Sequence, residues 1–379
     1  MTFIFLQIYN IYLGNQLFLF FFRIFATHNH RRTISNMGYE VTIGIPVYQA
    51  VHYIEKTMES ALNQSFNNIE YLVIDDCGED GSMEVIEQLK MNHPRGKDIR
   101  IIRNERNEGV GASRNHIIDE ACGQYLYFLD SDDYIEPNTV SLLLEEALNH
   151  EADVVYASLD RKDLVGNSPI RSMILPNLCL LSEDDLAFYA FKNYNSFQIS
   201  VCNCLMNLKF IRDNKIRFVD AAFWEDMAFT YELVTIVKRA VFLSDITYHY
   251  QCRSGSLSHY QEREQLDKNE IMSNVTIINY LKGKCLKFVD KKYLPYLCYN
   301  LEITSFYIIC HILKYRNRIN SKISWQELKR ILNHPMSLSK IITFRYKMFP
   351  NLFLKILGSI PILFFVPVIV LIGKIKRII

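Results

Sequence analysis

Apolar residues follow two periods that alternate along the chain from Glu40 onward. Short continuous apolar runs of strand length are each followed by a stretch in which apolar residues recur at helical spacing. The runs predict strands at 41–47, 70–74, 99–102, 124–129 and 152–157, and the stretches predict helices containing 54–62, 83–89, 112–121 and 140–148. This alternation predicts an α/β fold, in which a mostly parallel sheet has helices on both faces.

The residues directly after each predicted strand are the first candidates for function. In open α/β sheets, ligands bind outside the carboxyl ends of the strands. Four strand ends are therefore expected to converge on one crevice. They carry Pro46 and Tyr48, then Asp75 and Asp76, then the segment 107–115, and then Asp130, Ser131, Asp132 and Asp133.

Asp130, Ser131 and Asp132 form a compact acidic group after the fourth strand. Carboxylates gathered within a few ångströms repel one another unless a cation joins them. These short side chains offer the oxygen ligands that Mg2+ or Mn2+ prefers, with other positions left to water and diphosphate oxygens. The alternative is a polar turn that caps the helix after Pro137, with Asp133 as a turn residue.

A small-residue segment, 109–113, leads into the predicted helix that carries Arg114 in its first turn. Backbone N–H groups at a helix start can bind phosphate, and an arginine there can pair with phosphate through two hydrogen bonds. The segment matches neither the dinucleotide fingerprint nor a P-loop, because no Gly-Lys-Ser/Thr follows. On its own it does not identify a ligand.

The charge of the chain is almost balanced, with 42 lysines and arginines against 41 aspartates and glutamates. No overall field therefore attracts nucleic acid, and an anionic ligand must be bound locally. The nine cysteines lack paired CxxC spacing, so we interpret them as reduced, cytoplasmic thiols. Cys202 and Cys204 supply half of a zinc site, or occupy alternate positions on a strand.

Four segments together carry a resemblance that none carries alone: TIGIPVYQA, YLVIDDCGEDGS, RNEGVGASRNHIIDEACGQYLYFLDSDD and FWEDMAF. In order and spacing, residues 40–258 resemble the inverting family 2 glycosyltransferases. The resemblance implies a GT-A fold, which is Rossmann-like, followed here by a C-terminal helical region. It also implies a nucleotide-sugar donor and a divalent metal, Mn2+ or Mg2+.

The resemblance assigns the nucleobase to the first two strand ends. Pro46 and Tyr48 would form the sides of the pocket for the base, which is usually uracil. In the Asp75-Asp76 pair, Asp76 would accept the hydrogen bond of the base N–H. The family often has asparagine where this chain has Gln49, a change that should leave the base pocket intact.

The resemblance assigns the rest of the donor to the fourth strand end. Ribose and diphosphate would lie over Asp130 and Ser131, and Arg114 would sit beside the diphosphate. Asp132 would be the principal metal ligand, with Asp130 as the second. Many members supply a further metal-binding histidine in a segment that matches 248–256, and at that position this chain has Arg253. Either Arg253 binds the diphosphate directly, or the third metal ligand is His249 or water.

The resemblance assigns the catalytic base to an acidic pair far along the chain, matched by Glu225 and Asp226. Inversion needs a carboxylate on the acceptor side that takes the proton of the attacking hydroxyl. The alternative is structural, because two acidic residues at a helix start also favour the helix dipole.

Residues 1–36 form an apolar extension that carries no charge before Arg23. A secretory signal would have positive charge ahead of its apolar region and a small-residue cleavage site after it. We expect instead either a membrane anchor whose arginines keep the following domain in the cytoplasm, or translated sequence upstream of a true start at Met37. The catalytic domain is expected at 37–258.

After the catalytic domain, residues 259–350 predict a helical accessory region, either a small helical core or an acceptor platform. The tail 351–379 is apolar and ends in basic residues. Pro361 and Pro367 should break the tail into short pieces, so an interfacial membrane anchor suits it better than a clean span. The alternative is a helix docked on the protein itself.

The sequence therefore predicts an inverting, metal-dependent glycosyltransferase. It would move a sugar from a nucleotide diphosphate, with UDP as the first candidate, to a glycan or lipid-linked glycan. This transfer would be a step in cell-surface polysaccharide or glycolipid synthesis. We expect it at the cytoplasmic face of the cytoplasmic membrane, peripheral or monotopic. The alternatives are a catalytically silent sugar-nucleotide-binding or scaffold protein, and a nucleotidyltransferase, which would need a glycine-rich basic loop where residues 46–50 stand.

Overall fold

The computed structural model describes residues 38–163, 171–193, 201–221, 224–252 and 263–378. Its contacts divide the chain into residues 1–39 and residues 40–379. All the helices and strands named below belong to the second unit. The apolar extension 1–36 and the candidate Arg253 lie outside the described residues.

A ten-stranded sheet forms the centre of the catalytic region, in the order β3-β2-β1-β4-β9-β6-β10-β5. Its first half is parallel and contains β1 (Val41–Val47), β2 (Ile69–Asp75), β3 (Ile99–Arg103) and β4 (Tyr125–Phe128). Its second half is mixed. There β9 (Cys204–Asn207) runs antiparallel between β4 and β6 (Val154–Asp163), and β6 pairs in parallel with β10 (Ala240–Cys252). Three short strands pair antiparallel at the periphery: β5 (Tyr134–Ile135) and β8 (Leu178–Leu180) with β10, and β7 (Arg171–Met173) with β6.

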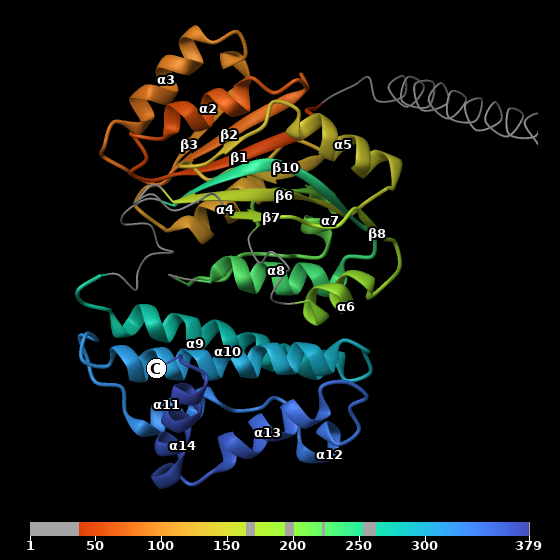
Figure 1. Ribbon diagram of the computed structural model, residues 1–379. Helices are drawn as coiled ribbons and strands as arrows, with labels where there is room; N and C mark the ends of the chain where they lie inside the picture. Colours follow the sequence, from red (N-terminus) through yellow and green to blue (C-terminus); the bar gives the residue numbers. More distant parts are fainter. Residues whose placement is uncertain (1–37, 164–170, 194–200, 222–223, 253–262, 379) are drawn as a thin grey trace, which may run out of the picture. The chain divides into compact units, whose positions relative to one another are not determined.

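Helices cover both faces of this sheet (Figure 1). One face carries α2 (Ile54–Leu62), α3 (Ser82–Asn92) and α5 (Thr139–Asn149), and the other carries α4 (Val110–Glu120), α7 (Leu208–Asp213) and α8 (Glu225–Ile236). The predicted α/β class is confirmed, and the predicted strands and helices match β1 to β4, β6 and α2 to α5, whereas the short strand β5 was not predicted. Cys204 begins β9, whereas Cys202 lies before that strand and forms an isolated bridge with Phe128, so the two do not share a strand; all nine cysteines are free thiols.

Helix α4 packs unusually close to the central strand because β1 contains a glycine at the crossing point. A Cβ atom built on Gly44 would lie 2.3 Å from Cγ2 of Ile117, which is itself fully buried. Contacts this close are not tolerated in a packed core. Gly44 therefore sets the height of α4 over the sheet, and with it the position of every side chain on that helix.

The C-terminal region is helical, as predicted, and packs on the catalytic region through α6 (Asp185–Lys192) and α8. Asn300 Nδ2 donates to the Phe191 carbonyl at 2.8 Å, and Lys284 Nζ lies 2.8 Å from Glu232 Oε1. Figure 1 shows α6 and α8 between the sheet and the long helices. The region consists of α9 (Lys268–Lys284), α10 (Leu294–Tyr315), α11 (Trp325–Ile331), α12 (Leu338–Ile341), α13 (Met348–Ser359) and α14 (Ile362–Ile375).

Helix α10 is the centre of this helical region. Among the described residues it alone is long and apolar enough to cross a membrane, but 78% of its most apolar window is buried inside the protein. It also carries Glu302, whose Oε1 lies 2.5 Å from Lys282 Nζ on α9, both side chains being buried. These features are those of the core helix of a globular bundle.

The apolar tail folds as two helices, α13 and α14, separated at Pro361 as predicted. Pro367 was expected to break the second piece, but it lies inside α14. Only the backbone hydrogen bond at that residue is lost, and buried Phe365 and Ile369 on either side hold the helix against the bundle. The tail thus has an inner face that packs on the protein and an outer face that is exposed.

The close approach of α4 to β1 gives a stability prediction. Gly44→Ala should lower the free energy of unfolding by about 1–3 kcal/mol through overpacking. Ile117→Ala alone should cost about 2–5 kcal/mol. In the double variant, Ile117→Ala removes the atoms that would clash with the new Cβ at residue 44. Its loss of unfolding free energy, measured by urea denaturation, should therefore be smaller than the sum of the two single losses.

Gly283→Ala is the matched control for this experiment. Its added Cβ meets nothing within 4 Å in helix α9, so it should leave stability unchanged or raise it by about 0.4–1 kcal/mol. Strict additivity of the Gly44 and Ile117 substitutions would contradict the proposed contact.

Candidate active site

The acidic segment after β4 is held in place by its last residue. Asp133 is fully buried, and its carboxylate accepts from Tyr248 Oη at 2.6 Å and from the Gln251 N–H at 2.8 Å, both on β10. Burial, reinforced by the charges of Asp132 and Asp130, raises the pKa of Asp133 well above its ordinary value. Asp133 is therefore the anchor of the segment rather than a simple turn residue.

Asp130, Ser131 and Asp132 lie on the segment that Asp133 anchors. Asp132 is half-buried, and its carbonyl accepts from Gln251 Nε2 at 2.7 Å. The Ser131 carbonyl accepts from Thr57 Oγ1 at 3.0 Å. Backbone contacts thus fix the segment, so its carboxylates stand at the strand end where the sequence placed them.

Arg114 joins two acidic groups that are far apart in sequence. Its Nη2 lies 2.7 Å from Asp130 Oδ1, and its Nη1 lies 2.9 Å from Glu225 Oε1. The guanidinium is buried, with its Nε unpaired among the described residues. Burial lowers the pKa of Arg114, but the charges of Asp130 and Glu225 outweigh this and raise that pKa above its ordinary value. The arginine therefore bridges the end of β4 and the start of α8.

Glu225 and Asp226 form the first turn of α8, directly after Trp224, whose φ is 62°. The start of α4 lies against this turn, since a Cβ built on Gly111 would lie 3.2 Å from Glu225 Cγ. Burial and the neighbouring charge of Glu225 raise the pKa of Asp226 to about 7. A carboxyl group with that pKa is suited to exchange a proton near neutral pH.

The second strand end is used partly for internal structure. Asp76 is buried and accepts three hydrogen bonds, from Asn104 Nδ2 at 2.8 Å and from the N–H groups of Glu108 and Gly109 at 2.8 and 2.9 Å. These bonds fix the loop that leads into α4.

The other nucleobase candidates lie at the ends of β2 and β1. Asp75 Oδ1 accepts from the Cys77 N–H at 3.1 Å. At the first strand end Pro46 is buried and Tyr48 is 43% exposed.

His249, an alternative metal ligand, is engaged by other carboxylates. Its ring nitrogens lie 2.7 Å from Glu136 Oε1 and 2.7 Å from Asp160 Oδ1, and its ring stacks on Tyr134. Within the part of the chain that the structure describes, no group of three or more His, Cys, Asp or Glu side chains could hold a metal by itself.

Sequence reasoning missed Tyr248 and Gln251, which shape the site, and it did not connect Cys202 with Asp130. The thiol of Cys202 donates to Asp130 Oδ2 at 3.1 Å. Tyr248 and Gln251 belong to β10, more than a hundred residues after the acidic segment, so no local pattern in the sequence connects them to it.

Comparison with known proteins identifies a domain of known family in the chain. The profile of "Glycosyl transferase family 2" matches residues 42–213. The chain carries a family 2 glycosyltransferase domain. This glycosyltransferase is 25% identical over 227 residues to the glycosyltransferase GlyG of Streptococcus pneumoniae, covering 57% of the chain and 72% of GlyG. It is 25% identical over 304 residues to the succinoglycan biosynthesis protein ExoO of Rhizobium meliloti, covering 79% of the chain and 83% of ExoO.

Solved structures show the same fold. Residues 1–349 of TarS from S. aureus, in complex with UDP, superpose with a TM-score of 0.53 at 17% identity, covering 84% of the glycosyltransferase and 90% of that chain. The mannosyltransferase PcManGT of Pyrobaculum calidifontis, in complex with GDP-Man and Mn2+, gives 0.50 at 10% identity, covering 88% and 91%. The glycosyltransferase therefore has the GT-A fold, with helices on both faces of a mixed sheet and a C-terminal helical region.

The Arg114 bridge gives a prediction for the site. Arg114→Leu leaves the Glu225 and Asp130 carboxylates without their partner, and should lower the free energy of unfolding by about 3–5 kcal/mol. Adding Glu225→Gln removes one uncompensated charge and should recover part of that loss. Arg103→Leu is the control, because its side chain is 62% exposed and lies 3.5 Å from Asp75; it should cost about 1 kcal/mol or less. Equal losses for the two arginines in urea denaturation would contradict the bridge.

Proposed function

We propose that the enzyme inverts the anomeric carbon as it moves a sugar from a nucleotide diphosphate, UDP in the first instance, to a hydroxyl of a glycan or lipid-linked glycan. The observation that carries this proposal is the bridge of Arg114 between Asp130 and Glu225. In this proposal, the bridge would hold Asp130 near the donor and Glu225 near the acceptor. The UDP in the TarS complex and the biosynthetic role in the name of ExoO support the donor and the product class.

The donor would lie along the carboxyl ends of β1, β2 and β4. Pro46 and half-exposed Tyr48 would wall the base. Asp76 already accepts three protein hydrogen bonds, so its contribution includes fixing the loop as well as meeting the base N–H. Asp75 would stand beside it, and Arg253 would reach the diphosphate.

Asp132 and Asp130 fit a divalent metal of the Mg2+ or Mn2+ type. Such ions bind through one or two carboxylates and complete their coordination with phosphate oxygens and water, which agrees with the small number of protein ligands. When bound, the ion would neutralise charge on the departing diphosphate. Arg114 and Ser131 would orient the carboxylates, with Arg114 acting as a positioning residue close to the diphosphate.

Asp226 would be the catalytic base. Its carboxylate, in the first turn of α8, would take the proton of the attacking hydroxyl, and Glu225 would keep it oriented through the Arg114 bridge. The pKa of about 7 matters here, because a base with that pKa is unprotonated in part at neutral pH and still has a strong affinity for the proton.

Substitutions of Asp226 and Asp132 should impair different steps, transfer and donor binding. Asp226→Asn keeps the shape but loses the proton acceptor, so turnover should fall by about 10²- to 10⁴-fold while UDP affinity barely changes. Asp132→Asn should instead weaken UDP binding in Mn2+, measured by calorimetry with and without a chelator. Glu232→Gln, on the same helix but paired with Lys284, is the control and should transfer at a near-normal rate.

The pH profile supplies a second readout for the same pair. Because the carboxylate form is required and its pKa is about 7, the transfer rate of the unaltered enzyme should fall as the pH drops below 7. The residual rate of Asp226→Asn should lack that dependence. Near-normal transfer by Asp226→Asn would mean that Glu225 or another group is the base.

We infer further that the outer face of α13 and α14 rests on a membrane surface. This outer face exposes Phe349 (75%), Phe353 (53%) and Leu363 (75%), and α14 ends beside Lys374, Lys376 and Arg377. Apolar side chains next to a basic cluster are the features of an interfacial anchor on anionic lipid. The cytoplasmic face of the cytoplasmic membrane is the site we propose.

Binding to phosphatidylglycerol vesicles tests this surface. The triple variant Phe349→Ser, Phe353→Ser and Leu363→Ser should bind at least about tenfold more weakly, since each side chain buried in lipid contributes about 1.5–3 kcal/mol. Its thermal unfolding should be unchanged, because none of the three is buried. Met91→Ser with Leu148→Ser, two exposed apolar residues outside the tail, should bind normally. Unchanged sedimentation of the triple variant with vesicles would refute the anchor.

A further inference from the structure

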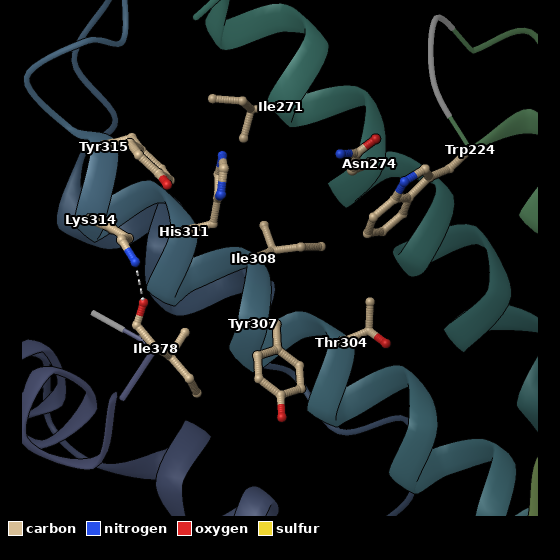
Figure 2. Close-up of a pocket in the computed structure, with 10 residues that line it drawn as sticks. All are labelled: Trp224, Ile271, Asn274, Thr304, Tyr307, Ile308, His311, Lys314, Tyr315 and Ile378. Atoms are coloured by element: carbon tan, nitrogen blue, oxygen red, sulfur yellow. Dashed lines mark hydrogen bonds between the residues drawn. The ribbon is translucent and has the colours of Figure 1, made fainter. Parts of the chain in front are cut away.

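A cavity lies among the C-terminal helices and the residue that precedes α8 (Figure 2). Its volume is about 290 Å³. Side chains of α9 and α10 line it, together with Trp224 and, near the chain's end, Ile378. This volume is at the lower limit of small-molecule sites, so the cavity suits one ring-sized group.

Much of the cavity wall is aromatic or aliphatic. Trp224, Tyr307 and Tyr315 contribute rings, and Ile271 and Ile308 contribute aliphatic surface. Tyr307 is 50% exposed although it is a large ring on a helix that is otherwise almost completely buried. Aromatic rings give a flat apolar contact with a polar edge, which suits a ligand that is apolar on one face and polar around its rim.

The polar part of the wall requires a hydrogen-bond donor. Asn274 is 4% exposed, and its Oδ1 has no hydrogen-bond partner among the described residues. A buried carbonyl oxygen without a partner is unfavourable by about 1–3 kcal/mol. Lys314 is occupied, since its Nζ donates to the Ile378 carbonyl at 2.9 Å. Burial, assisted by the charges of Arg318 and Lys314, lowers the pKa of His311.

These features distinguish among possible occupants. An alkyl chain would fill the apolar part but leave the Asn274 oxygen unpaired. A phosphate diester has no hydrogen to donate, so it too would leave the Asn274 oxygen unpaired. A sugar ring has C–H groups for the aromatic wall and hydroxyls that donate to Asn274.

We propose that this cavity is a sugar-binding subsite that holds a pyranose ring of the acceptor glycan, one or more residues away from the hydroxyl that reacts. The proposal rests on the proposed function, because it takes the ring to be part of the acceptor. Trp224 lines the cavity and immediately precedes Glu225 and Asp226. A glycan seated there would therefore reach the proposed base along the start of α8.

The chain offers a direct reporter of occupancy, since it has only two tryptophans, Trp224 and Trp325. Replacing Trp325, which is 48% exposed, by phenylalanine leaves Trp224 as the single fluorophore. In this full-length background, methyl glycosides of glucose, galactose and N-acetylglucosamine are titrated as probes. At least one should change the Trp224 emission saturably.

Asn274→Leu and Asn274→Asp separate hydrogen bonding from shape. Asn274→Leu removes the acceptor and should weaken binding of that glycoside by about tenfold, the loss expected for one hydrogen bond in a buried site. Asn274→Asp keeps acceptor oxygens and should bind within about threefold of the parent. Tyr307→Ala should weaken binding and Tyr307→Phe should not, because the ring supplies the contact. Thr276→Ala, on the exposed side of α9, is the control.

UDP binding in Mn2+ is measured in the same proteins and separates this proposal from the function itself. Normal UDP affinity without a saturable glycoside response, or with an unchanged response in Asn274→Leu, would overturn the subsite and leave the donor site intact. A response to octanol but to none of the glycosides would also overturn it, in favour of an alkyl ligand. Glycoside binding without UDP binding would support the subsite and contradict the proposed donor.

Discussion

The buried guanidinium of Arg114 is the constraint on which the site depends. A charge taken out of water must be matched by opposite charges with good geometry, and here the match comes from Asp130 at the end of β4 and Glu225 at the start of α8. Two glycines make the arrangement sterically feasible: Gly44 lets α4 settle on β1, and Gly111 lets the start of α4 meet Glu225. The separation of Asp130 and Glu225 is thereby fixed by packed backbone rather than by flexible loops.

The regular part of the fold could be predicted from apolar periodicity, and the irregular part could not. Strands β1 and β2 are buried along their whole length, so they appear in the sequence as continuous apolar runs. Strand β10 contains Ser244, Asp245 and His249, and its register with β6 shifts twice. Strands β5 and β9 have two and four residues. Short or interrupted strands lack a period long enough to recognise, because their partners, which lie elsewhere in the chain, decide their conformation.

The candidate site shows the same division. The sequence could place Asp130 and Asp132 because they follow a regular strand, and it singled out Glu225 and Asp226 through the family resemblance. It could not show that Arg114 binds two of them, since Arg114 and Glu225 are 111 residues apart. Nor could it show that Asp133 is an anchor, because that role depends on β10. Sequence patterns report local structure, whereas the electrostatics of a site arise from contacts between distant segments.

The attachment of Asp133 to β10 has a consequence for how the enzyme matures. Asp133 and Tyr248 are 115 residues apart, so the acidic segment cannot be fixed until the chain through β10 has left the ribosome. The parallel half of the sheet, built from residues 41–128, has local connections and can form earlier. During synthesis the parallel half of the sheet thus leaves the ribosome more than a hundred residues before the partner of Asp133 does. A nascent chain in which that half has already folded still lacks the hydrogen bonds from β10 that fix the acidic segment.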